Sequence, residues 1–77
     1  MEHHRQCKLS RQVDGRMEVI TTWLTDKYAH IGKVLEIQVG PDKWQNGWSV
    51  CEVFARIKTE EAVARERDYK RIRGEDI

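Results

Sequence analysis

The stretch 33-KVLEIQV-39 carries the clearest structural signal in the chain. Leu35, Ile37 and Val39 fall on one side of an extended chain, and polar residues alternate with them on the other side. Because successive side chains of a strand point to opposite faces, this alternation is typical of a strand with one buried face. We therefore expect the segment to lie in a sheet that has one apolar side.

A hairpin is expected before this strand. The candidate strands Cys7 to Gln12 and Met17 to Leu24 flank Asp14-Gly15, a pair that favours a type I′ turn because glycine accepts the positive φ that the turn requires. The second strand is rich in β-branched and aromatic residues, which disfavour a helix. On a period of two, one face is expected to carry Met17, Val19, Thr21 and Trp23.

The segment after Val39 is expected to break the sheet and then resume it. Gly40-Pro41-Asp42 is a turn signal, and Asn46-Gly47 is a second one, so Lys43 to Gln45 is predicted to be a short edge segment at most. Trp48 to Ile57 then regains strand character.

The C-terminal segment has the signals of a helix from Thr59 to Arg73. Thr59 is a suitable N-cap, Glu60 and Glu61 lie in the first turn, basic residues lie in the last turn, and Gly74 follows as a C′ residue. The predicted fold class is α+β and β-rich. We expect a small antiparallel meander or SH3-like open barrel, with this one helix packed across an edge or used in dimerisation.

Length and composition limit the domain organisation. With 77 residues, of which 39% are hydrophobic, the chain has room for one core, so residues 1–77 are expected to form a single domain whose residues 1–6 are a flexible N-terminus. No apolar run approaches the roughly 18 to 20 residues that cross a bilayer. Cys7 and Cys51 are far apart and are expected to be reduced thiols, with Cys51 buried, so a cytoplasmic location is predicted.

Charge and motifs argue against several classes of function. There are 14 basic and 13 acidic residues, and the net charge of +1 is far from that of a dedicated nucleic-acid binder. The sequence lacks the paired cysteine and histidine spacings of a zinc site and a glycine-rich phosphate loop. It also lacks a nucleophile accompanied by a recognisable base and orienting group. We therefore expect no enzyme activity, no cofactor and no metal.

Several short runs of residues bear a likeness to known proteins. They are Thr22-Trp23-Leu24, Lys27-Tyr28-Ala29, Gly32-Lys33-Val34-Leu35, Asn46-Gly47-Trp48-Ser49-Val50, Arg65-Glu66-Arg67-Asp68-Tyr69-Lys70-Arg71 and Asp76-Ile77. In these runs the chain resembles short uncharacterised proteins encoded by bacteriophages and prophages. The likeness covers most of the chain after Met17. It implies a viral or mobile-element origin, in the cytoplasm of a bacterial host, and no catalytic residue.

The three tryptophans suggest a contact surface, because a core this small does not easily cover them all. Trp23 and Trp48 are expected in the core and Trp44 is expected to be exposed. The predicted contact residues are Trp44, Trp48, Arg65, Tyr69 and Arg71. The expected function is stoichiometric binding to a host protein or self-association as a homodimer.

Two alternatives stay open. One is a nucleic-acid-binding regulator that uses the basic end of the C-terminal segment, with an exposed indole stacking on a base. The other is an anti-defence protein that sequesters a small anionic ligand, such as a nucleotide, through Lys33, Arg65 and Arg71.

Overall fold

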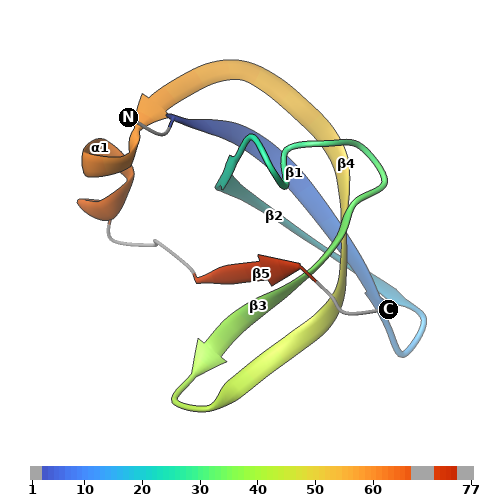
Figure 1. Cartoon of the computed structure of the whole chain (residues 1–77). Helices are drawn as coiled ribbons and strands as arrows, with labels where there is room; N and C mark the ends of the chain where they lie inside the picture. Colours follow the sequence, from blue (N-terminus) through green and yellow to red (C-terminus); the bar gives the residue numbers. More distant parts are fainter. Residues whose placement is uncertain (1–2, 67–70, 75–77) are drawn as a thin grey trace.

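The computed structural model describes residues 3–66 and 71–74, which form an open antiparallel sheet with one short helix (Figure 1). The elements are β1 (His3–Val13), β2 (Arg16–Thr25), β3 (Val34–Gly40), β4 (Lys43–Thr59), α1 (Glu60–Ala64) and β5 (Ile72–Gly74). The 5-stranded sheet has the order β2-β1-β4-β3-β5 and is not closed. The predicted β-rich antiparallel sheet is confirmed at this level.

The predicted hairpin is present at the start of the chain. Asp14 and Gly15 have φ angles of 49° and 78°, as a type I′ turn requires. From this turn β1 and β2 pair without a register shift, from Val13 opposite Arg16 to His4 opposite Thr25.

The order of the strands differs from that of a meander. The two hairpins, β1-β2 and β3-β4, are joined side by side through β1 and β4, so that β2 and β3 are not neighbours. Leu9 lies opposite Val50 in this central pair, and both side chains are buried. Long-range burial of apolar side chains therefore decides the order, and it overrides adjacency along the chain.

The predicted turn at Asn46-Gly47 is wrong. Both residues lie inside β4, a single strand of 17 residues, at a point where its register with β3 shifts. Gly47 has a φ of 81°, so it accommodates a bulge in place of a turn. Bulges bend a strand, and Figure 1 shows β4 curving from the β3–β4 turn to α1.

The predicted helix from Thr59 to Arg73 is wrong for the described residues after Ala64, and its residues 67–70 lie outside the described part of the chain. Its start is confirmed, since the Thr59 hydroxyl accepts a hydrogen bond from the Ala62 amide at 3.3 Å, but α1 ends at Ala64. Ile72–Gly74 is strand β5, with Ile72 opposite Ile37 of β3. Helix signals of a few tenths of a kcal/mol per side-chain pair are outweighed by packing of Ile72 against the core.

The N-terminal segment is more ordered than its sequence predicts. His3 to Gln6 belong to β1, and the His4 side chain is buried. The expectation of a flexible segment is therefore wrong for residues 3–6, while residues 1–2 lie outside the described part of the chain.

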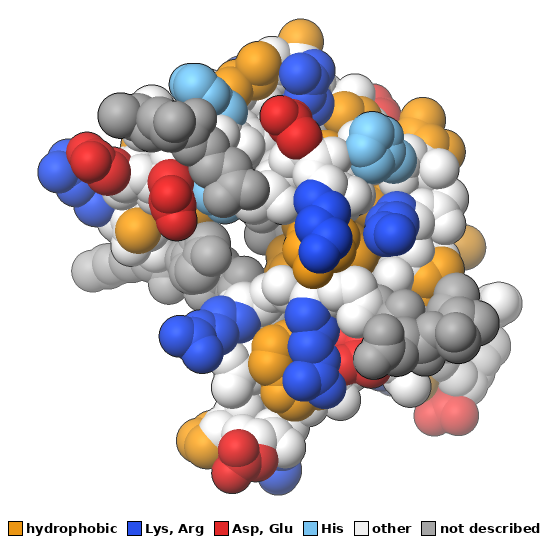
Figure 2. Space-filling view, in the orientation of Figure 1, with side chains coloured by type: hydrophobic (Ala, Val, Ile, Leu, Met, Phe, Trp, Pro, Cys, Tyr) orange, Lys and Arg blue, Asp and Glu red, His pale blue; other side chains and the backbone are white. Residues whose placement is uncertain are grey.

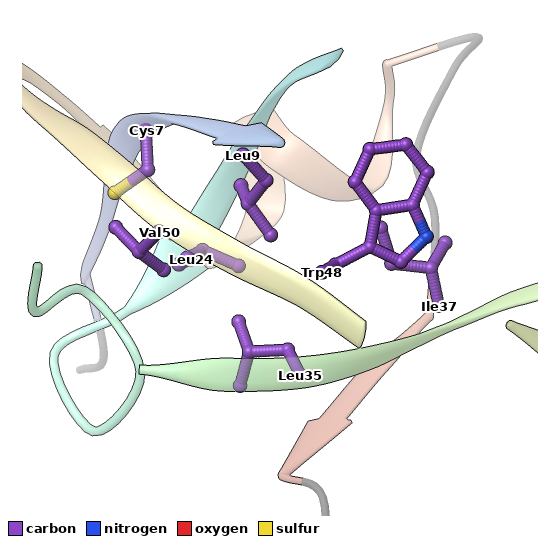
Figure 3. Close-up of a cluster of buried hydrophobic side chains, with 7 residues drawn as sticks. All are labelled: Cys7, Leu9, Leu24, Leu35, Ile37, Trp48 and Val50. Atoms are coloured by element: carbon purple, nitrogen blue, oxygen red, sulfur yellow. The ribbon is translucent and has the colours of Figure 1, made fainter. Parts of the chain in front are cut away.

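The core lies on the inner side of the curled sheet (Figure 3). Its buried members come from the four long strands and are Cys7, Leu9, Leu24, Leu35, Ile37, Trp48 and Val50. Val63 of α1 is also fully buried, which fixes the helix against the ends of β1 and β4. Within residues 3–66 and 71–74, no helix has the length and apolar character needed to cross a membrane.

Candidate functional site

The structure does not bring the predicted contact residues together. Trp48 is 3% exposed and belongs to the core, so its indole offers no contact surface. Arg65 is exposed at the C-cap of α1, which lies at the opposite end of Figure 1 from the β3–β4 turn beside Trp44. Arg71 is exposed next to β5, and Tyr69 lies outside the described residues.

The predicted exposure of Trp44 is also wrong. Trp44 is half-buried, and the Arg73 guanidinium lies 4.0 Å from the centre of its ring. The Nε of Arg73 in turn donates a hydrogen bond to the Glu36 carboxylate at 2.5 Å. One face of this indole is therefore occupied by a cation whose charge is paired.

The other two tryptophans are covered in the same way. Lys58 lies 4.8 Å from the ring centre of Trp23, and Arg11 lies 5.6 Å from that of Trp48. Trp23 is only half-buried, so the expectation that it lies in the core is wrong. Figure 2 shows Lys and Arg side chains lying against hydrophobic ones on the visible face. Cation–π packing of this kind covers ring faces of the indoles with side chains of the same chain.

Exposed apolar side chains gather instead on β2. Met17 is 69% exposed and Val19 is 48% exposed, and their spacing of two places them on one face of the strand. Among the described residues the other large exposed hydrophobics are Ile31 in the loop after β2, Val39 on β3 and Ile57 on β4. This face of β2 is thus the candidate contact surface.

β2 is also an edge of the sheet, so one side of its backbone has no strand beside it. In a two-residue hairpin the two residues that flank the turn form a hydrogen-bonded pair, here Val13 and Arg16. Beyond this pair, hydrogen-bonded and non-hydrogen-bonded pairs alternate along the two strands. The even-numbered residues of β2 therefore bond to β1. The backbone groups that point to the free edge belong to Met17, Val19, Thr21 and Trp23. The Thr25 carbonyl instead accepts hydrogen bonds from the amides of Tyr28 and Ala29, at 2.9 Å and 3.0 Å.

The edge of β2 has few of the features that usually prevent strand pairing. It is 10 residues long, contains no proline or lysine, and carries only two charged residues, Arg16 and Glu18. Its pairing with β1 contains no bulge. Protected edges are short, charged or bulged, and the other edge of this sheet, β5, is only 3 residues long. The edge of β2 is therefore a regular template for another strand.

The sequence contains part of the signal for this site. The shared face of Met17, Val19 and Thr21 follows from a period of two, and it was predicted. That β2 lies at the edge could not be predicted, because it depends on the pairing of β1 with β4.

A separate hollow lies at the start of β1, beside the ends of β2 and β4. Its volume is about 310 Å³ and its lining residues are His3, His4, Arg5, Asp26 and Ile57. Lys33, Arg65 and Arg71, the residues suggested for an anionic ligand, are not among them. Within the described residues, no group of three or more histidine, cysteine, aspartate and glutamate side chains is placed to hold a metal ion.

The two thiols occupy different environments. Cys7 is fully buried, and this burial raises the pKa of its thiol, against a smaller opposing effect of the Arg5 charge. Cys51 is exposed, contrary to expectation, and its Sγ donates to the Lys8 carbonyl at 3.3 Å. The thiolate is the reactive form, so Cys7 is doubly protected.

We predict that iodoacetamide modifies Cys51 rapidly at neutral pH and modifies Cys7 only when the chain unfolds. Mass spectrometry of the alkylated protein in buffer and in urea measures both rates. Equal rates in buffer would contradict the burial of Cys7.

Comparison with known proteins adds no relative to this picture. No protein-family model, no curated protein and no solved structure matches the chain.

Proposed function

We propose that this chain is a small non-enzymatic protein-binding module that accepts an extended strand on the free edge of β2. The observation that carries the proposal is the long regular edge itself, with Met17 and Val19 exposed beside it. In such β-augmentation, main-chain hydrogen bonds supply affinity and alternate side chains supply specificity. The protein-binding function expected from the sequence is retained. Its proposed contact surface is on β2 and not on the tryptophans.

Nucleic-acid binding has less support. The stacking face of Trp44 is taken by Arg73, and Glu36 pairs with that cation. A base would have to displace both groups before it could stack.

A small anionic ligand is the second candidate, because Arg5 and His3 line the hollow at the start of β1. The carboxylate of Asp26 in the same lining opposes an anion. Isothermal titration with a panel of nucleotides tests this candidate, and the absence of heat at millimolar ligand would remove it.

We also propose that the protein comes from a bacteriophage or prophage and acts as an accessory protein in the cytoplasm of the host cell. The sequence runs that resemble short phage proteins support this origin. The finer fold assignment, an open barrel of the SH3-like kind, is likewise a proposal. It is supported by the size of the chain and the curl of the sheet.

The proposed edge makes a prediction with a matched control. Val19 and Val39 are exposed to 48% and 50%, and they lie on β2 and β3 respectively. Val19→Lys is expected to weaken the binding of extended peptides by about tenfold, because a charge replaces an apolar contact beside the edge, a loss of roughly 1.4 kcal/mol. Val39→Lys is expected to leave binding unchanged.

The peptides for this measurement are selected from a random displayed library on the unmodified chain, and fluorescence anisotropy gives their affinities. Equal losses from the two substitutions, or no loss from either, would contradict binding at β2. A selection that gives no peptide dependent on Val19 would contradict it as well.

A further inference from the structure

We propose that the hollow at the start of β1 binds a small zwitterion, namely an α-amino acid with an apolar side chain. The Arg5 guanidinium binds the ligand's carboxylate, and the Asp26 carboxylate binds its ammonium group. The residues that line the hollow come from β1, from β4 and from the turn after β2. The site is therefore separate from the strand-binding edge of β2, and the inference goes beyond the proposed function.

The ends of three strands bring the lining residues together. Arg5 of β1 lies opposite Ile57 of β4 on one side and opposite Leu24 of β2 on the other. Residues that lie directly opposite each other in an antiparallel pair have side chains on the same face of the sheet. Leu24 is buried in the core, so Arg5 and Ile57 project from the inner face, at the end of the core.

Asp26 is held beside this face by the turn that follows β2. The Thr25 carbonyl accepts hydrogen bonds from the amides of Tyr28 and Ala29, which closes a turn over Asp26. Thr25 is itself paired with His4 of β1, so the turn begins next to the hollow. A backbone that is already ordered loses less entropy when a ligand binds. The backbone of Asp26 is therefore in position before the ligand arrives.

Two opposite charges line the hollow without neutralising each other. Arg5 is half-buried, and within residues 3–66 and 71–74 neither Arg5 nor Asp26 forms an ion pair. Their charged atoms are therefore more than 4.0 Å apart. A guanidinium has five donors and no acceptor, and a carboxylate has only acceptors. Both groups are thus available to a ligand that lies between them.

This pair of charges selects the charge of the ligand. A simple anion is attracted by Arg5 and repelled by Asp26, and a simple cation meets the reverse. A molecule that carries one charge of each sign is attracted by both residues. An α-amino acid has this property at neutral pH, because its carboxyl group is ionised and its amino group is protonated.

The size and the apolar wall of the hollow restrict the ligand further. The volume of about 310 Å³ lies near the lower limit of ligand sites, which span roughly 300–1,000 Å³, and it suits one amino acid better than a nucleotide. Ile57 is 51% exposed and forms an apolar wall of the hollow. An aliphatic side chain that covers Ile57 gains from the burial of apolar area. L-Leucine is therefore the probe.

Titration of the unmodified chain with L-leucine and two analogues tests the charge requirement. Isocaproate lacks the ammonium group, and isoamylamine lacks the carboxylate. Each analogue is expected to bind at least about tenfold more weakly than leucine, because one charge-assisted contact is lost. Isothermal titration calorimetry measures the three affinities. The absence of leucine binding at millimolar concentration overturns the proposal, and so does isocaproate binding as tight as that of leucine, which indicates a simple anion site.

Two substitutions test the roles of the charged residues. Arg5→Gln is expected to weaken leucine binding about tenfold. Asp26→Asn is expected to weaken leucine binding by a similar factor and to strengthen isocaproate binding, because the repulsion of its carboxylate is removed. These opposite effects of one substitution on two ligands are not expected from a purely structural role of Asp26.

Matched controls are available at exposed positions outside the hollow. Arg56 lies on β4 next to Ile57, and Asp42 lies in the β3–β4 turn. Arg56→Gln and Asp42→Asn are expected to leave both affinities unchanged, and circular dichroism confirms that all four variants are folded. Leucine binding that survives both R5Q and D26N, or that falls equally in the two controls, overturns the site.

Failure of this inference is distinguishable from failure of the proposed function. Val19→Lys is expected to weaken peptide binding and to leave leucine binding unchanged, because Val19 does not line the hollow. A chain that binds selected peptides and no leucine overturns the amino-acid site alone. A chain that binds leucine and no Val19-dependent peptide overturns strand binding alone.

Discussion

Replacing Trp48 with alanine is expected to unfold the chain at room temperature. Trp48 is 3% exposed, lies opposite Leu35 and packs in the main core cluster. Truncation of a buried tryptophan costs about 3–5 kcal/mol. A single core in a chain of this size rarely supplies more than about 3–5 kcal/mol of stability in total. The cost of the substitution therefore matches the whole stability of the fold.

The same substitution at Trp44 is the control. Trp44 is half-buried and its ring is covered by Arg73, so Trp44→Ala removes a partly exposed cation–π contact worth about 0.5–1 kcal/mol together with some buried area. We expect W44A to stay folded with a lowered melting temperature. Circular dichroism during thermal and urea unfolding measures both variants. A folded W48A, or a W44A that unfolds equally, would contradict the assignment of these two indoles.

The second large effect is expected at two neighbouring threonines of β2. Thr21→Pro is expected to leave the fold intact and abolish strand binding, because the Thr21 amide points to the free edge and proline lacks that donor. Thr22→Pro is expected to destabilise the fold. The Thr22 amide faces Cys7 of β1, and its side chain is 7% exposed. Loss of this bond leaves a buried carbonyl unpaired, at a cost of about 1–3 kcal/mol.

This pair of variants separates folding from binding with one residue type. Circular dichroism gives the stability of each variant, and sedimentation equilibrium with peptide titration gives its association. T21P is expected to melt close to the unmodified protein but to bind no peptide. If T21P unfolds as readily as T22P, the alternation of backbone groups along β2 is wrong. If T21P still associates, the free edge is not the site.

Part of the candidate site was predictable from sequence. The strand of residues 17–24 and the face shared by Met17 and Val19 follow from residue type and a period of two. The exposure of that face does not follow from the sequence, because the same pattern on a central strand would be covered by a neighbouring element. The tryptophans were misassigned for a related reason: Lys58, Arg11 and Arg73 reach their rings only after distant strands have paired.

What the sequence by itself determined is local. The type I′ turn at Asp14-Gly15, the alternating strand within 33-KVLEIQV-39 and the Thr59 cap all depend on residues within a few positions of one another. Backbone preferences and side-chain alternation act at that range whatever the rest of the chain does. The predicted turn, strand and cap are confirmed at these three places. Leu35 and Ile37 are buried as expected, but Val39, which was expected on the same buried face, is 50% exposed.

Tertiary structure alone decided the features that depend on distant pairing. Asn46-Gly47 became a bulge because β4 continues past it between β1 and β3, and Ile72–Gly74 became a strand because Ile37 lies opposite Ile72. The order β2-β1-β4-β3-β5 likewise follows from burying Leu9 against Val50. Burial of apolar area across the sheet is worth more than weak local turn and helix preferences, so it set which strand was left at the edge.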